Sequence, residues 1–401
     1  MGDILKKRFS SFTEAEETKK RGLYSFFRTF ESKQETNVRV NGKDLLMFGS
    51  NSYLGLTTHP KVMEASIEAI KKYGSSCSGS RFLNGTTDLH VELEDRLAKF
   101  IGKEEVLVFS TGFQVNLGTI PTVATQGDTI LIDRLSHASI YEGSRISDAS
   151  TTIFRHNDMA SLERKLQKLG DQNLRLIIVD GVFSMEGNIA KLPEIVDLAK
   201  KYDAVVLCDD AHAVGVMGEN GRGTANHFGL TDEVDLIGGT FSKSFASLGG
   251  YMAGDRETMQ YIKHHSRSLI FSASMTPAST AATLAALDIM ESDDSLRLKL
   301  WENTNYSLAR FRDLGFDIGD TETPIIPVYI RDNEKTYKMT ARLFEEGVFV
   351  NPVVAPAVAP ADSLFRFSLM ATHTTEQIDK AIDLIVKVAN ELDIKLREKV
   401  A

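Results

Sequence analysis

The chain has 401 residues, of which 42% are hydrophobic and 25% are charged, so it holds enough apolar side chains for a large core. Its formal net charge of −9 argues against a general nucleic-acid binder, because phosphate backbones are bound by clustered lysine and arginine. The sequence has no N-terminal secretory signal and no apolar run near the roughly 18 residues of a membrane span. Its two cysteines, Cys77 and Cys208, indicate a reduced, cytoplasmic protein without a disulfide framework.

Residues 1–50 predict an N-terminal arm followed by a hairpin. Residues 1–36 are charged, and we expect a helical arm that lies on a partner subunit. Basic residues at 6–8 and 19–21 leave open a peripheral contact with the inner face of the membrane, although a solvated helix face is the simpler interpretation. Residues 38–48 alternate apolar and polar side chains around an Asn-Gly pair, which predicts a β-hairpin.

Residues 51–285 form the predicted large domain, in which helical segments alternate with short apolar strands. Strands of this kind, apolar throughout, belong to a sheet that is covered on both faces. We therefore expect an α/β domain with a mainly parallel central sheet. The predicted helices are 59–73, 88–101, 159–169 and 191–202, and the predicted strands are 105–109, 128–132, 174–179, 204–208, 234–238 and 250–253.

Residues 286–401 predict a smaller α+β domain. A long helix at 295–313 precedes a strand at 325–330, a helix at 334–346, a strand near 365–369 and a terminal helix. The terminal helix has one apolar face, made of Ile378, Ile382, Ile385, Ala389 and Leu392.

A lysine and an aspartate at two strand ends carry the first chemical signal. Lys243 follows an apolar strand within the run Gly-Thr-Phe-Ser-Lys-Ser at 239–244. An amine in this setting is suited to form an imine with an aldehyde cofactor whose phosphate is bound by the neighbouring hydroxyls. Asp209 ends another apolar strand, where its carboxylate is suited to pair with a pyridine nitrogen. Alone, each residue has a simpler interpretation as a solvated lysine or a loop cap; together they favour pyridoxal phosphate (PLP).

Polar residues also follow three other predicted strands, and one lies just beyond Asp209. Residues 110–114 begin a helix whose free backbone N–H groups suit a phosphate. His137 is suited to stack on a planar ring, although a lone histidine is more often a structural hydrogen-bonding residue. Ser184 and His212 are placed to bind cofactor oxygens. Because all five segments follow strands of one parallel sheet, we expect them to converge at its carboxyl edge, where such sheets bind ligands.

Motifs of other enzyme classes are missing. The acidic strand end at 205–212 resembles that of an ATPase, but the chain has no G-x-x-x-x-G-K-[ST] loop. The sequence also has no G-x-S-x-G elbow, C-x-x-C pair or H-E-x-x-H motif, so a serine hydrolase or a zinc enzyme has no support. We expect no metal site.

Seven segments occur in an order that resembles the α-oxoamine synthases, which are PLP-dependent transferases of the aspartate-aminotransferase fold (fold type I). The resemblance extends from about residue 20 to 390, and its segments are 51–56, 79–86, 110–113, 136–139, 183–187, 209–212 and 239–244. Within the family, residues 79–86, 239–244 and 349–352 are most similar to the bacterial serine palmitoyltransferases.

This resemblance implies a role for each matching residue. Lys243 would hold PLP covalently and act as the general base, Asp209 would pair with the ring nitrogen, and His137 would stack on the ring and contact the substrate carboxylate. Asn51 and Arg366 would bind the amino-acid carboxylate. The implied cofactor-binding residues are Gly112, Phe113, His137, Ser184, Asp209, His212, Thr240, Lys243 and Ser272. Of these, Ser272 would come from the partner subunit of a homodimer with active sites at the interface.

The implied reaction is the decarboxylating condensation of L-serine with palmitoyl-CoA, a long-chain acyl-CoA, to 3-ketodihydrosphingosine, the first step of sphingolipid synthesis. Alternatives within the family are a glycine C-acetyltransferase (2-amino-3-ketobutyrate CoA ligase) and an 8-amino-7-oxononanoate synthase. An aminotransferase or lyase would share Lys243 and Asp209, whereas a non-enzymatic protein is disfavoured because every cofactor position is retained. One departure concerns an Arg-Pro-Pro segment common in serine palmitoyltransferases; this chain has Val-Val-Ala-Pro at 353–356, which leaves Arg366 as the principal carboxylate ligand.

Overall fold

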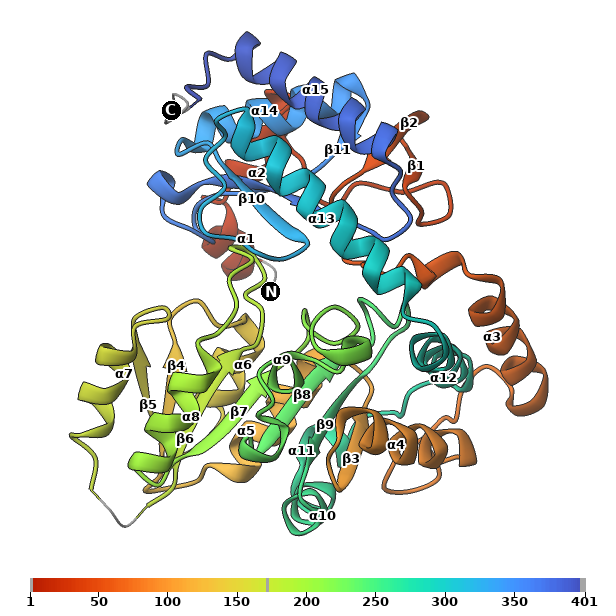
Figure 1. The fold of residues 1–401 in the computed structure, drawn as a ribbon, viewed down its shortest axis with the longest axis vertical. Coiled ribbons are helices and arrows are strands. Elements are labelled where there is room, and N and C mark those ends of the chain that lie inside the picture. Colours follow the sequence, from red (N-terminus) through yellow and green to blue (C-terminus); the bar gives the residue numbers. More distant parts are fainter. Residues whose placement is uncertain (1–2, 171–172, 397–401) are drawn as a thin grey trace.

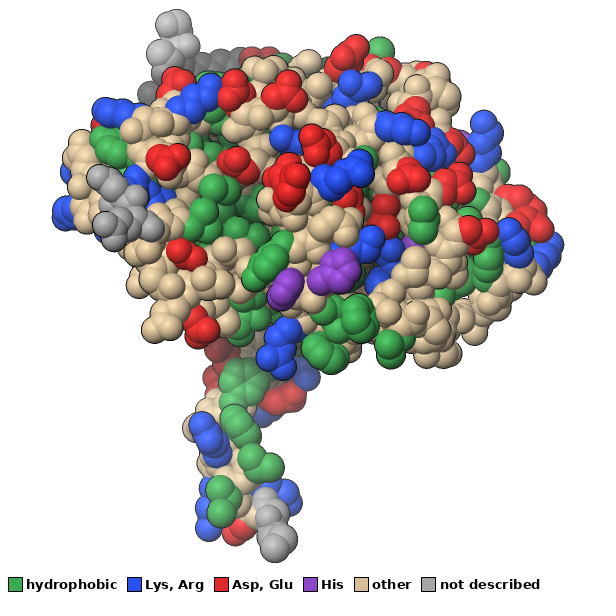
Figure 2. All heavy atoms as spheres, turned by 90° about the horizontal axis from the view of Figure 1, so that it is seen from below, with side chains coloured by type: hydrophobic (Ala, Val, Ile, Leu, Met, Phe, Trp, Pro, Cys, Tyr) green, Lys and Arg blue, Asp and Glu red, His purple; other side chains and the backbone are tan. Residues whose placement is uncertain are grey.

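The computed structural model describes residues 3–170 and 173–396 (Figure 1). The outermost parts of the predicted arm and small domain, residues 1–2 and 397–401, lie outside this range. The arm contains two short helices, α1 (Asp3–Phe9) and α2 (Glu14–Lys20), and neither helix buries a side chain. Figure 2 shows the arm standing away from the body of the molecule, with apolar and basic side chains on its surface.

The predicted hairpin is confirmed. Strands β1 (Asn37–Val40) and β2 (Lys43–Met47) pair antiparallel, and both turn residues, Asn41 and Gly42, have positive φ. This turn geometry matches the twist of the paired strands, which explains the Asn-Gly sequence. The free edge of β2 pairs in parallel with β11 (Val348–Phe349), so the hairpin joins the C-terminal part of the fold.

A seven-stranded sheet forms the centre of the large domain, with strand order β3-β9-β8-β7-β6-β4-β5. Only β9 runs opposite to its neighbours, which confirms the expectation of a mainly parallel sheet. The edge strand β5 was not expected, because its sequence Ser-Thr-Thr-Ile-Phe is too polar for a strand buried on both faces. The bounds are β3 Glu105–Phe109, β4 Thr129–Asp133, β5 Ser150–Phe154, β6 Arg175–Asp180, β7 Val205–Asp209, β8 Leu236–Thr240 and β9 Gly250–Gly254.

Helices cover both faces of this sheet (Figure 1). Successive strand residues therefore enter two separate apolar clusters: Leu176 and Ile178 belong to one, and Ile177 and Val179 to the other. The helices of the large domain are α3 Pro60–Tyr73, α4 Asp88–Ile101, α5 Gly112–Val123, α6 Ala138–Arg145, α7 Met159–Leu166, α8 Leu192–Lys201, α9 Thr224–His227, α10 Arg256–His265, α11 Arg267–Ile270 and α12 Pro277–Ser292.

The C-terminal part is a small antiparallel sheet packed against long helices. Its strand order is β10-β13-β12, and the strands span Ile325–Tyr329, Leu364–Ser368 and Asn351–Val353 respectively. Helices α13 (Ser295–Asp313), α14 (Asn333–Glu346) and α15 (Thr375–Glu391) lie close to their predicted positions. The boundary suggested at 285/286 falls inside α12, a continuous helix that packs on α3 and α4 of the large domain.

Within the described part of the chain, no helix is both long enough and apolar enough to cross a bilayer.

Candidate active site

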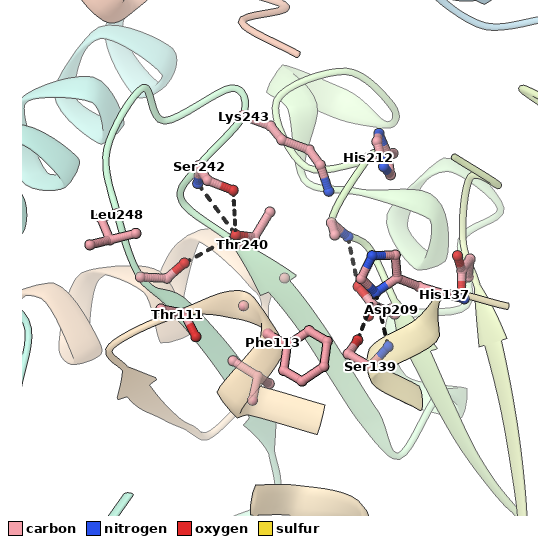
Figure 3. Close-up of a pocket in the computed structure, with 16 residues that line it drawn as sticks. Thr111, Phe113, His137, Ser139, Asp209, His212, Thr240, Ser242, Lys243 and Leu248 are labelled. Atoms are coloured by element: carbon pink, nitrogen blue, oxygen red, sulfur yellow. Dashed lines mark hydrogen bonds between the residues drawn. The ribbon is translucent and has the colours of Figure 1, made fainter. Parts of the chain in front are cut away.

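The carboxyl ends of five strands meet at one edge of the central sheet. Because β9 alone is reversed, β3, β4, β6, β7 and β8 all point toward this edge. A cavity of about 310 Å³ lies there, within the usual range for small-molecule sites (Figure 3). Four of the five polar segments expected to converge contribute residues to this cavity, whereas the segment after β6 that contains Ser184 does not. The residues that line the cavity are Thr111, Gly112, Phe113, Val115, His137, Ser139, Asp180, Asp209, Ala211, His212, Gly239, Thr240, Ser242, Lys243, Leu248 and Gly249.

Lys243 lies on the loop after β8 and extends into the cavity toward the region lined by Asp209 and His212 (Figure 3). Burial lowers the pKa of its ammonium group from 10.5 to about 8, and the nearby carboxylate of Asp209 opposes this shift. An amine with a pKa near the working pH is suited to act as a nucleophile and as a general base. The loop around it is tightly folded, since Ser247 donates its backbone N–H to the carbonyl of Phe241.

Asp209 ends β7, and neutral donors fix its carboxylate. Its Oδ2 accepts a hydrogen bond from Asn116 Nδ2 at 2.7 Å, and its Oδ1 accepts from the backbone N–H of Ala211 at 3.0 Å. Asn116 Nδ2 also donates to Ser139 Oγ at 2.8 Å. No sequence signal selects Asn116, because it lies in the interior of α5 outside any motif.

His137 caps the N-terminus of α6. Its Nδ1 accepts the backbone N–H of Ser139 at 3.2 Å, so a neutral His137 carries its proton on Nε2. Burial lowers the pKa of this imidazole, as does Lys243, while Asp209 opposes them. The ring is therefore neutral at pH 7 and offers an Nε2–H donor.

Asp180, at the end of β6, also lines the cavity and was missed by the sequence reasoning. Its Oδ1 accepts the backbone N–H of His137 at 3.2 Å. Burial, reinforced by the charge of Asp209, raises the pKa of the Asp180 carboxyl well above its usual range. Two adjacent buried carboxylates repel each other, so only one of Asp180 and Asp209 can readily be ionised. The raised pKa of Asp180 favours its protonated form.

At the opposite end of the cavity, α5 presents its N-terminus beside hydroxyl groups. Thr240 Oγ1 lies 2.9 Å from Ser242 Oγ and donates to the carbonyl of Gly249 at 3.1 Å. A Cβ on Gly112 would lie only 2.7 Å from Thr240 Oγ1, so glycine is what allows the threonine to approach the helix. Free backbone N–H groups and hydroxyls together form an anion-binding end.

Arg366 and Asn51 are brought together by β13 and the segment after β2. Arg366 Nη2 lies 2.6 Å from Asn51 Oδ1 and 2.9 Å from the hydroxyl of Tyr53, which in turn lies 2.7 Å from His212 Nδ1. Arg366 is 8% exposed, and its Nε–H has no hydrogen-bond partner among the described residues. These contacts connect Arg366 and Asn51 to the cavity through Tyr53 and His212. Tyr53 lies in the segment 51–56 that resembles the family, but no sequence signal indicated a role for it.

Two expected cofactor-binding residues, Ser184 and Ser272, do not line the cavity. Ser184 lies half-buried on the loop after β6, a loop that is tied to the small domain because the carbonyl of Gly187 accepts hydrogen bonds from the hydroxyls of Thr321 and Thr323. Ser272 accepts a hydrogen bond from Gln114 Nε2 at 3.1 Å behind the start of α5. Their cofactor contacts stay predictions.

The model of the class I and II aminotransferase family matches residues 43–385. The chain belongs to this family. Among its members, serine palmitoyltransferase from Sphingobacterium spiritivorum is 55% identical over 391 residues, which are 98% of both chains. An 8-amino-7-oxononanoate synthase from Thermoanaerobacter pseudethanolicus is 44% identical, covering 94% of this chain and 96% of the relative.

Solved structures agree with this placement within the aminotransferase family. The structure of a lysine-to-alanine variant of serine palmitoyltransferase from S. paucimobilis, with a bound PLP–myriocin aldimine, matches with a TM-score of 0.94 and 33% identity. The match covers 98% of this chain and 100% of that one. The resemblance to the α-oxoamine synthases and the expected fold type are thereby confirmed.

Proposed function

We propose that this chain is a PLP-dependent acyltransferase that condenses L-serine with palmitoyl-CoA to 3-ketodihydrosphingosine, releasing CoA and carbon dioxide. The observation that carries the proposal is the pairing of Lys243, with its lowered pKa, and Asp209 in one cavity at the carboxyl edge of the sheet. The identity of 55% to a serine palmitoyltransferase along nearly the whole chain supports the choice of substrates.

The residues of the cavity fit PLP. The start of α5 with Thr240 and Ser242 suits its phosphate, Asp209 suits its ring nitrogen, and Lys243 suits its aldehyde. The close approach of Thr240 to Gly112 leaves no room for a side chain at that turn, as a phosphate cradle requires. When bound, PLP supplies an electron sink for the electron pair left at the substrate Cα.

The protein residues then handle protons and charge. Asp209 holds a proton on the ring nitrogen, because its fixed carboxylate stabilises the cationic form. Lys243 Nζ, partly neutral near pH 8, removes the Cα proton. His137 donates its Nε2–H to the substrate carboxylate and so restrains early loss of carbon dioxide.

The substrate carboxylate binds at Arg366. Its buried, unpartnered Nε–H needs an acceptor, and a carboxylate supplies one with a charge-assisted bond. Asn51 holds the guanidinium in place by accepting from Nη2. In this chain no Arg-Pro-Pro segment supplements the contact, so we assign Arg366 as the principal ligand of the substrate carboxylate.

We propose a homodimer with its active sites at the subunit interface. Large apolar side chains are exposed in the cavity lining, where Leu248 is 53% exposed, and on two segments joined by the bridge between Ser80 and Ala273. On these segments Phe82 is 57% exposed, and Leu83 and Phe271 are each 77% exposed. A second subunit would cover them and would bring its own Ser272 toward the phosphate end. The free thiols of Cys77 and Cys208 support a reducing, cytoplasmic location. Membrane contact by the basic arm stays a prediction.

A second candidate is an 8-amino-7-oxononanoate synthase, favoured by the relative at 44% identity. That product implies alanine joined to a seven-carbon dicarboxylic acyl group instead of serine joined to a long alkyl chain. The two candidates differ in the acyl site that they need: an apolar site suited to a palmitoyl chain would reject the terminal carboxylate, because an unpaired charge is costly to desolvate.

A matrix of amino acids and acyl-CoAs tests the proposal. Serine, alanine and glycine are each paired with acetyl-, pimeloyl- and palmitoyl-CoA, and products are identified by mass spectrometry alongside CoA release. Serine with palmitoyl-CoA should give the highest kcat/KM, and Lys243→Ala should abolish both turnover and the borohydride-trapped cofactor adduct. The best rate with alanine and pimeloyl-CoA, or with glycine and acetyl-CoA, would overturn the substrate assignment.

A further inference from the structure

The hydroxyl of Tyr53 lies between the guanidinium of Arg366 and the imidazole of His212. It is 2.9 Å from Arg366 Nη2 and 2.7 Å from His212 Nδ1, and the tyrosine side chain is only 1% exposed. His212 lines the cavity, whereas Arg366 stands behind it in β13. Nothing in the catalytic scheme above uses this tyrosine.

The direction of each hydrogen bond follows from which atoms can donate. An arginine guanidinium has no acceptor, so Arg366 must donate to the Tyr53 oxygen. The single phenolic proton of Tyr53 then points to His212 Nδ1, which accepts it. If Nδ1 carried a proton instead, the phenolic proton would be buried without an acceptor among the described residues, at the cost of a lost hydrogen bond.

The protonation states of the two rings are consistent with this direction. Burial, together with the charges of Lys243 and Arg366, lowers the pKa of His212 well below its usual value, so its imidazole is neutral. Burial raises the pKa of Tyr53, so its phenol keeps the proton that it donates. A neutral His212 that accepts at Nδ1 carries its own proton on Nε2.

We propose that Tyr53 is a positioning residue that fixes His212 as the Nε2–H tautomer and, through the same oxygen, holds the Arg366 guanidinium in place. His212 then presents a hydrogen-bond donor to the cofactor ring oxygen instead of a lone pair. The proposal rests on the proposed PLP-dependent function for its consequence in catalysis. The tautomer itself is a property of the protein without cofactor or substrate.

The direct test is nitrogen NMR of the cofactor-free protein labelled with ¹⁵N-histidine. Coupling patterns of the ring protons distinguish the two neutral tautomers, and His212→Asn assigns the His212 signals. In the wild type, Nδ1 of His212 should be the unprotonated nitrogen. Tyr53→Phe should shift the population toward a mixture of tautomers, because the donor to Nδ1 is lost.

Tyr251→Phe is the matched control. Tyr251 is fully buried, and its hydroxyl has no hydrogen-bond partner among the described residues. The same atom is removed, so the His212 signals should stay as in the wild type. Holoenzyme kinetics add a second readout: Tyr53→Phe should lower kcat/KM for serine by about tenfold to a hundredfold, and it should displace the pH titration of the cofactor absorbance band.

A protonated Nδ1 on His212 in the wild type would overturn the proposal, and so would an unchanged tautomer in Tyr53→Phe. The wild-type measurement decides the matter even if Tyr53→Phe does not fold. A failure of serine condensation in the substrate matrix would remove the proposed function but leave the tautomer result standing.

Discussion

Replacing Lys243 by methionine should stabilise the cofactor-free protein, by an amount that depends on pH. The ammonium pKa is about 8 in the folded chain against 10.5 when unfolded, so the unfolded chain binds more protons between these values. The stability of the wild type therefore rises with pH across this window, and the full penalty is present below pH 8. Lys243→Met removes a group whose burial opposes folding.

The size of the gain follows from the two pKa values. At 1.36 kcal/mol per pKa unit, the free energy of unfolding should rise on substitution by about 3 kcal/mol at pH 7. By the same relation, the gain should fall to about 2 kcal/mol at pH 9 and to less than about 1 kcal/mol at pH 10.5. Burial of Lys243 thus lowers the stability of the fold but supplies an amine that is reactive near neutral pH.

Urea unfolding of both cofactor-free proteins at these three pH values measures the difference. Titration of every other group cancels when the two proteins are compared at the same pH. Lys61→Met, at an exposed position on α3, controls for removing an ammonium group as such. A gain for Lys243→Met that is zero, or that stays constant from pH 7 to 10.5, would refute the reasoning.

Three further outcomes are expected. Asp209→Asn should keep its cofactor but lose about tenfold to a hundredfold in kcat/KM, and near-normal turnover would rule out its role at the ring nitrogen. Gly187→Ala should lower stability by about 2–4 kcal/mol in thermal unfolding, because its φ is +67° and a Cβ would overlap Ile325. Gly170→Ala, which meets open space, should change stability by less than about 0.5 kcal/mol. Phe271→Asp should shift the sedimenting species toward monomer, and a fully active wild-type monomer would contradict the proposed dimer.

Local patterns predicted most elements of the fold because apolar periodicity and strand-end chemistry are encoded in neighbouring residues. The hairpin at Asn41-Gly42 and helix α4 were placed correctly on such signals. Strand β5 was not predicted, because an edge strand keeps polar side chains on its exposed face, as in its Ser-Thr-Thr start. The predicted domain boundary at 285/286 falls inside α12, so a change in the pattern of apolar residues along the sequence does not mark the end of a helix.

The site was predictable where a residue follows a strand and unpredictable where its role depends on a distant partner. Lys243, Asp209 and His137 were found from their positions at strand ends. The contact of Tyr53 with His212 joins residues 159 positions apart, and only the fold brings them together. Asp180 also ends a strand, but it was not predicted, because its role depends on Asp209, its partner on the neighbouring strand.

The pairing of β2 with β11 has a consequence for how the protein is made. Gly49, which follows β2, also accepts a hydrogen bond at its carbonyl from the side chain of Asn351, 302 residues later in the chain. At about 5–20 residues per second, a ribosome needs roughly 15–60 s to reach that partner after releasing the hairpin. For that interval the nascent chain carries an open strand edge, which other chains can pair with. Truncation before Val348, which removes β11 and leaves the edge of β2 open, should therefore cause aggregation starting at the N-terminal end.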